Sequence, residues 1–152
     1  AIKYAVAKQV AGGLLRIERA ITTYQKNSWN QADPSYLDSE TMHQLTEITR
    51  RLRYAITQKY PRHKLANDGT RFAAGQAIVT PSVIRGELLA EYAAMEEIGL
   101  VENAKAFAKY LIVERDSNNP NRVNVLLPPD LVNQLRIFAL LNQFRLQYRA
   151  DA

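Results

Sequence analysis

The sequence predicts an α+β domain in which a mainly antiparallel sheet of about four strands packs on two longer helices and one short helix. Two segments carry apolar residues at spacings of three and four, which is typical of helices with one buried face. Other segments are rich in β-branched and aromatic residues and lie between turn sequences, which indicates strands. The expected order is a strand, two helices, a short helix and three strands.

The start of the chain is expected to hold one strand. Residues 1–13 are rich in alanine and weakly patterned, which is compatible with a short helix, an arm or a linker. Residues 14–24 are rich in Ile and Thr and predict a strand. Residues 26–34 carry Asn, Asp and Pro, so they predict a loop before the first helix.

The first long helix should be capped by Asp38 or Ser39 and run to about Lys59. The Tyr60-Pro61 pair ends it, because a residue that precedes proline disfavours the helical conformation. The apolar residues at helical spacing predict its buried face: Met42, Leu45, Ile48, Leu52, Ala55 and Ile56.

The second long helix follows a loop over residues 62–79, which includes a short strand at 76–79. Thr80-Pro81 is a favourable helix start, with Thr as the cap and Pro in the first turn, and Gly99 ends the helix. Its inner face is predicted to be Ile84, Leu88, Tyr92 and Met95.

A short helix and a hairpin are expected next. Residues 103–109 predict the short helix, and residues 110–115 predict a strand. The turn sequence at 116–121 leads to a returning strand at 122–127, so the two strands should pair as a hairpin.

The C-terminal segment is apolar, and its first half admits two interpretations. Residues 128–130 either cap a helix that carries Leu131, Leu135 and Phe138, or turn the chain into a long strand from about Gln134 onward. The β-branched content and the alternation at the end favour the strand. Phe144, Leu146 and Tyr148 alternate with Gln143, Arg145, Gln147 and Arg149, which is typical of a strand buried on one face.

A strand at the end of a chain has an open edge, and we expect a neighbouring molecule to cover it. The candidate subunit-joining arm therefore consists of Phe144, Arg145, Leu146, Gln147 and Tyr148.

The composition excludes several kinds of site. The chain has no cysteine, which excludes disulfides, thiolate metal sites and cysteine nucleophiles. With only His43 and His63, a histidine zinc site is not expected either. No motif predicts a cofactor, a small-molecule substrate or a catalytic constellation, so the chain is not expected to be an enzyme. No apolar run is long enough for a membrane span, and the first residues do not resemble a signal peptide.

One sequence resembles a catalytic motif but lacks its nucleophile. Residues 67–70 contain the Asp-Gly-Thr of aspartyl-phosphate phosphatases. That chemistry needs a second Asp two residues earlier, at the end of a buried strand. The position holds Ala66, and Lys64-Leu65 is not expected to be a strand, so a surface turn is predicted.

The net charge of +5 favours an acidic partner, which can be nucleic acid, an anionic membrane or an acidic protein surface. A candidate patch for such a partner follows from the basic residues of the first helix and its end. The alternatives are that these residues form a solvated helix face, or that the chain is a nucleic-acid-binding basic module. The patch comprises Arg50, Arg51, Arg53, Arg62 and Lys64.

Several ordered blocks of the chain, spread over residues 14–148, resemble the C-terminal domain of Mu-like contractile phage tail sheath proteins. The blocks are residues 19–25, 36–43, 61–71, 76–81, 99–103 and 121–146. Residues 1–13 match nothing in that family, and its larger N-terminal portion has no counterpart here. The resemblance therefore implies a fragment: an arm or linker at 1–13, a tube-proximal domain at 14–141 and a C-terminal arm at 142–152.

The resemblance implies a structural function. Subunits of such sheaths form a homo-oligomer of stacked six-fold rings around an inner tail tube, with a baseplate and a tail terminator at the ends. Terminal arms add strands to the sheets of neighbouring subunits, and contraction drives the tube through the host envelope during genome ejection. Such a protein belongs to the virion and is assembled in the bacterial host cytoplasm. Sheaths of phage-tail-like bacteriocins and secretion machines share the design.

Overall fold

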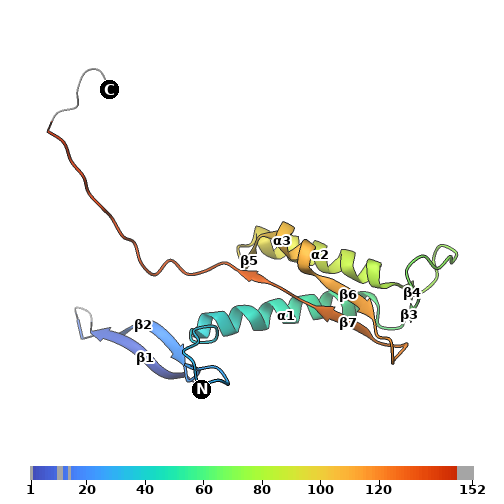
Figure 1. Cartoon of the computed structure of the whole chain (residues 1–152), viewed down its shortest axis with the longest axis horizontal. Coiled ribbons are helices and arrows are strands. Elements are labelled where there is room, and N and C mark those ends of the chain that lie inside the picture. Colours follow the sequence, from blue (N-terminus) through green and yellow to red (C-terminus); the bar gives the residue numbers. More distant parts are fainter. Residues whose placement is uncertain (1, 10–11, 14, 147–152) are drawn as a thin grey trace.

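The computed structural model of the chain describes residues 2–9, 12–13 and 15–146. Helices α1 and α2 lie side by side, and short strand pairs lie next to them. Together with α3, these elements form the body of the molecule (Figure 1). The helices are α1 (Ser39–Lys59), α2 (Pro81–Glu97) and α3 (Ala104–Tyr110). The strands are β1 (Ile2–Gln9), β2 (Leu15–Thr22), β3 (Lys64–Leu65), β4 (Ile78–Val79), β5 (Val101–Glu102), β6 (Ile112–Arg115), β7 (Val123–Leu126) and β8 (Asp130–Leu131).

The α+β class is confirmed, but the described strands form four separate two-stranded sheets instead of one sheet. The pairs β1–β2, β5–β8 and β6–β7 are antiparallel, and β3–β4 is parallel. The difference arises because β2 pairs with the segment just before it, so it does not join the strands of the body. That segment, for which a short helix was one expectation, is a strand over residues 2–9. Gly12 and Gly13 both have positive φ in the connection between β1 and β2.

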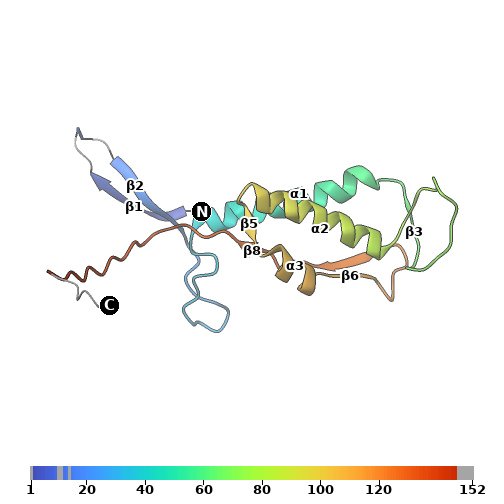
Figure 2. The same cartoon turned by 90° about the horizontal axis from the view of Figure 1, so that it is seen from above.

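The core lies between α1, α2, α3 and the strands at their sides. The predicted inner face of α2 is buried at all four positions. In α1, Ile48 and Leu52 are buried, whereas Met42 is 40% exposed. The first turns of α1, which include Met42, extend past the end of α2 (Figures 1 and 2). The buried apolar cluster is Ile48, Leu52, Val79, Ile84, Leu88, Tyr92, Met95, Val101, Phe107 and Leu111.

The ends of α2 follow the sequence signals. Thr80 occupies the cap position, its hydroxyl accepts from the backbone N–H of Val83, and Pro81 begins the helix. Gly99 has a φ of 70° and follows the last residues of the helix, as predicted. The N–H of Leu100 donates to the carbonyl of Met95 at 3.0 Å, which satisfies a free carbonyl at the helix end.

The loop between α1 and α2 contains a strand that was not expected. Lys64 and Leu65 form β3 and pair in parallel with β4, so the expectation that they are not a strand is wrong. The N–H groups of Lys64 and Ala66 donate to the carbonyls of Ala77 and Val79, at 2.8 and 2.9 Å. Asp68 accepts from the backbone N–H and the hydroxyl of Ser82, at 3.0 and 2.6 Å. The Asp-Gly-Thr sequence is therefore a surface turn tied to the start of α2, as predicted.

The hairpin of β6 and β7 is confirmed, with Ile112 opposite Leu126 and Arg115 opposite Val123. Its turn is held by Asp116, whose carboxylate accepts from the backbone N–H groups of Asn118 and Asn119 at 2.8 Å each.

Candidate interaction site

After β8 the chain continues as an extended tail, residues 132–146, which passes the first turns of α1 and then runs away from the helices (Figures 1 and 2). The expected strand from about Gln134 is not formed, because no described segment lies beside the tail to pair with it. The helix alternative is not formed either. Phe144 is 80% and Leu146 98% exposed in the single chain, so the expected burial of one face against a neighbouring molecule stays a prediction. Alternation predicts which side chains share a face, but burial requires a partner.

The tail carries a continuous series of large apolar side chains that the described chain does not cover. Fully burying each of them would be favourable by roughly 1.5–3 kcal/mol. Exposed apolar surface of this extent in one segment indicates an interaction site. Of the predicted subunit-joining arm, Phe144, Arg145 and Leu146 are exposed, and Gln147 and Tyr148 lie outside the described residues. The exposed apolar residues of the tail are Leu135, Ile137, Phe138, Leu140, Leu141, Phe144 and Leu146.

Hydrogen bonds from Tyr92 and Gln44 hold β8 and the first residue of the tail on the body. Tyr92, fully buried in α2, donates its hydroxyl hydrogen to the carbonyl of Glu102 at 2.8 Å and accepts from the N–H of Asp130 at 3.0 Å. Its hydroxyl therefore joins β5 to β8. Burial raises the pKa of Tyr92, so the hydroxyl stays protonated at neutral pH. Gln44 of α1 donates to the carbonyl of Val132 at 3.1 Å.

The β1–β2 pair, called the N-terminal hairpin below, extends from the same end of the body as the tail (Figures 1 and 2). Each strand has eight residues, and among the described residues the two strands pair with each other, apart from an isolated bridge between Ile21 and Asp38 at the base. The base of the hairpin is tied to the start of α1 by the N–H of Thr22, which donates to the carbonyl of Leu37 at 2.7 Å. Two-stranded sheets leave an unpaired edge on each side.

The five residues of the predicted basic patch differ in their environments. Arg50 pairs with Glu47 at 2.7 Å, and this hydrogen bond lowers the pKa of the Glu47 carboxyl. Arg51 points to α2, where it pairs with Glu91 at 2.8 Å. Arg53, Arg62 and Lys64 are exposed and form no ion pair with a described residue. Only three of the five cations of the predicted patch are therefore without an ion pair to a described residue.

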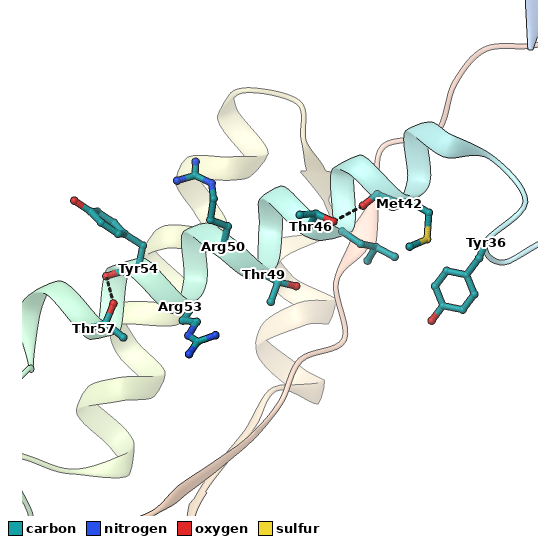
Figure 3. A pocket seen from close by; sticks show the side chains of 9 residues that line it. Tyr36, Met42, Thr46, Thr49, Arg50, Arg53, Tyr54 and Thr57 are labelled. Carbon is teal, nitrogen blue, oxygen red and sulfur yellow. Dashed lines mark hydrogen bonds between the residues drawn. The ribbon is translucent and has the colours of Figure 1, made fainter. Parts of the chain in front are cut away.

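An open groove runs along the outer side of α1. Arg50 and Arg53 project beside it, and Tyr36 and Met42 line its other end (Figure 3). Thr46 and Thr57 hydrogen-bond to carbonyls of their own helix, to Met42 at 2.8 Å and Tyr54 at 3.3 Å. The groove is therefore lined by apolar side chains, threonines and arginines. Its lining residues include no carboxylate that could form a catalytic acid–base pair.

No group of three or more His, Cys, Asp or Glu side chains that could hold a metal ion occurs in the described part of the chain. The same residues include no helix that is both long and apolar enough to cross a membrane.

The sequence interpretation missed one group of residues at the start of the tail. The sequence predicts Asp38 or Ser39 as the cap of α1; Asp38 occupies the cap position in the extended conformation, but its carboxylate makes no cap hydrogen bond. It binds Arg19 of β2 and Arg136 of the tail. The available signal was Arg136 itself, a cation within an apolar run, although nothing local identified its partner.

Two comparisons with known proteins show the family of this chain. Residues 31–145 match the family model of the phage tail sheath C-terminal domain. The chain is also 55% identical over 134 residues to the Mu-like prophage FluMu tail sheath protein of Haemophilus influenzae. The match covers 88% of this chain and 28% of that relative. The chain therefore belongs to the phage tail sheath C-terminal domain family, a structural and non-enzymatic family.

Proposed function

We propose that this chain is the tube-proximal part of a contractile sheath subunit, and that its tail joins neighbouring subunits. The subunits polymerise as stacked six-fold rings around an inner tube, and the sheath contracts to drive the tube through the host envelope during genome ejection. The observation that carries the proposal is the extended tail, whose large apolar side chains are exposed although the rest of the domain has a closed core. The described part of a single copy leaves this surface exposed, whereas a polymer can bury it.

The tail joins subunits by strand addition. An extended segment can add to an open sheet edge, where backbone hydrogen bonds supply affinity and alternate side chains supply specificity. The N-terminal hairpin of a neighbouring copy offers such edges, and both segments extend from the same end of the body. Residues 142–152 are the part of the chain that completes this contact, with Phe144 and Leu146 packing on one side.

Contraction needs no nucleotide under this proposal. It is driven by the free-energy difference between two packings of the same subunits. The strand-addition contacts are kept during contraction, and the contacts between bodies change. The assembled protein is part of the virion, is built in the host cytoplasm, and ends on a baseplate and a tail terminator.

The proposed contact between the tail of one copy and the N-terminal hairpin of another can be tested by cysteine cross-linking. The chain has no cysteine of its own, so only introduced cysteines in this part of the protein react. In the full-length protein, with any other cysteines replaced, Ile17→Cys and Leu140→Cys are placed on separate copies that are then assembled together. Ile17 lies on β2 and is 63% exposed, and Leu140 is 78% exposed. A short thiol-specific cross-linker should join the two copies in assembled sheaths and not in unassembled protein.

The matched control replaces Ile17→Cys by Ser117→Cys, an exposed position in the turn between β6 and β7 at the far end of the body. Strand addition to the N-terminal hairpin predicts a much lower yield of cross-linked dimer for Ser117→Cys with Leu140→Cys than for Ile17→Cys with Leu140→Cys. Equal yields for the two pairs would be evidence against the hairpin as the acceptor.

The inner tube is the proposed acidic partner of the exposed cations Arg53, Arg62 and Lys64. Changing all three to Glu in the full-length protein should reduce co-sedimentation with tubes several-fold at low salt, and less at high salt, because salt screens exposed charges. Arg51→Gln is the control, since Arg51 is already paired with Glu91. Unchanged tube binding by the triple variant contradicts the assignment, and a salt-sensitive shift of duplex DNA by the unmodified protein would favour a nucleic-acid partner instead.

A further inference from the structure

Asp38 lies where three parts of the molecule meet: β2, the start of α1 and the tail. Arg19 of β2 binds its carboxylate with two hydrogen bonds, from Nε to Oδ1 at 2.7 Å and from Nη2 to Oδ2 at 3.1 Å. Arg136 of the tail approaches the same Oδ1 with Nη2 at 3.2 Å. One side chain therefore contacts both segments that extend from the body.

Glu40 completes the charge balance of this cluster. Its Oε2 lies 3.6 Å from Nη2 of Arg136 and is buried without a hydrogen-bond partner among the described residues. Two carboxylates thus face two guanidinium groups. The side chains of Asp38, Arg136 and Glu40 are 19%, 32% and 35% exposed, so solvent screens these pairs less than fully exposed ones.

The start of α1 is a favourable place for both carboxylates. Asp38 occupies the cap position and Glu40 lies in the first turn, where the helix dipole favours negative charge. The hydrogen bond from Arg19, followed by the charge of Arg136, holds the pKa of Asp38 below its ordinary value despite partial burial. Asp38 therefore remains ionised at neutral pH and can bind both arginines.

The tail is held along α1 at two successive points. Gln44 binds the carbonyl of Val132, and Asp38 with Glu40 binds Arg136. The tail thus runs antiparallel to the first turns of α1 before it leaves the body. A tether at one point would leave the direction of the tail free, whereas contacts at two points define it.

We propose that Asp38 and Glu40 form a positioning site that sets the direction of the C-terminal tail and couples it, through Arg19, to the N-terminal hairpin. The direction matters for strand addition because a pre-oriented segment loses less conformational entropy when it binds. This consequence rests on the proposed function, but the positioning itself is a property of a single copy and can be measured without assembly.

The experiment uses spin labels on cysteines introduced into the unassembled chain. One label is placed at Gln58, exposed near the end of α1, and one at Leu140 in the tail. The distance distribution between them reports the direction of the tail relative to the body. Asp38→Asn keeps the size of the side chain and its capacity to cap a helix, but removes the charge. This variant and Arg136→Gln should each broaden the distribution about two-fold, because the released tail behaves as a flexible chain.

The double variant Asp38→Asn/Arg136→Gln should be no broader than Arg136→Gln alone, since Arg136→Gln already removes the contacts of the tail with both Asp38 and Glu40. Glu47→Gln is the matched control, because it breaks the ion pair with Arg50 on the same helix, away from the tail. Arg136→Lys keeps the charge and should recover most of the narrow distribution. A folded Asp38→Asn protein with the distribution of the unmodified chain overturns the positioning site.

A second readout separates this inference from the proposed function. In the full-length protein, Asp38→Asn should slow sheath assembly several-fold and leave the morphology of the finished sheaths unchanged, because the tail itself is intact. A broadened distance distribution together with an unchanged assembly rate would show that the direction of the tail does not affect sheath assembly. Failure of the cross-linking experiment with normal positioning would count only against strand addition.

Discussion

Deletion of residues 142–152 should leave a soluble, folded domain and abolish polymerisation of the full-length protein. Among the described residues, the buried apolar cluster and the side chains packed on it end at Leu131, so none of the core side chains that the structure describes is removed. It removes Phe144 and Leu146, which are 80% and 98% exposed in the single copy. If both are buried in the polymer, the loss is about 3–6 kcal/mol for each subunit contact, or roughly two to four powers of ten in affinity.

Electron microscopy of the truncated full-length protein, together with sedimentation velocity, measures this effect. Thermal unfolding of the truncated and complete chains should give the same midpoint. The variant Phe144→Ser/Leu146→Ser keeps the length of the tail and should give most of the same loss, whereas Asn142→Ser/Gln143→Ser should assemble normally. Normal sheaths formed by the truncated protein would exclude residues 142–152 as the joining arm.

Replacement of Tyr92 by Ala should destabilise the chain by about 3–5 kcal/mol, as large-to-small substitutions of buried aromatic residues do. Tyr92 is fully buried and stacks on Phe107, with ring centroids 3.7 Å apart and an angle of 9° between the ring planes. Its removal leaves a cavity between α2 and α3. It also leaves Glu102 and Asp130 without the hydroxyl that joins β5 to β8.

Tyr92→Phe separates the two contributions, because it keeps the ring and removes only the hydroxyl. The expected loss is about 1–3 kcal/mol, the usual range for leaving a buried polar group unpaired. Urea denaturation followed by circular dichroism measures both variants. A Tyr92→Phe protein as stable as the unmodified chain would show that the pairing of β5 with β8 does not depend on this hydroxyl.

The helices and the β6–β7 hairpin were predictable because their sequence signals are local. The apolar spacing of α2 placed Ile84, Leu88, Tyr92 and Met95 on one face, and all four are buried. Thr80-Pro81 and Gly99 marked the ends of this helix, since capping and positive φ depend on residues within one turn.

The pairing of the strands was less predictable. Residues 1–13 carry no clear period, yet residues 2–9 form β1, because pairing with β2 supplies the backbone hydrogen bonds that the pattern did not reveal. Lys64–Leu65 became β3 for a similar reason, with a partner that lies in the segment leading to α2. A two-residue strand has no period of its own, so only its contact partner defines it.

The candidate site shows the same division between local and long-range information. The alternation of Phe144 and Leu146 with polar residues indicated an extended segment suited to a partner, and the segment is extended. Whether a partner strand lay within the chain was a question of tertiary contacts, and the described residues contain none. The role of Asp38 was hidden as well, because its local context equally suits a helix cap.

By itself, the sequence determined the helices, the β6–β7 hairpin and the apolar, alternating character of the C-terminal end, since each depends on neighbouring residues. The departure of the tail from its own core and the meeting of Arg19 and Arg136 at one carboxylate depend on long-range packing. The physical reason is that ion pairs and strand pairs join residues distant in sequence, and their formation depends on how the chain packs in space.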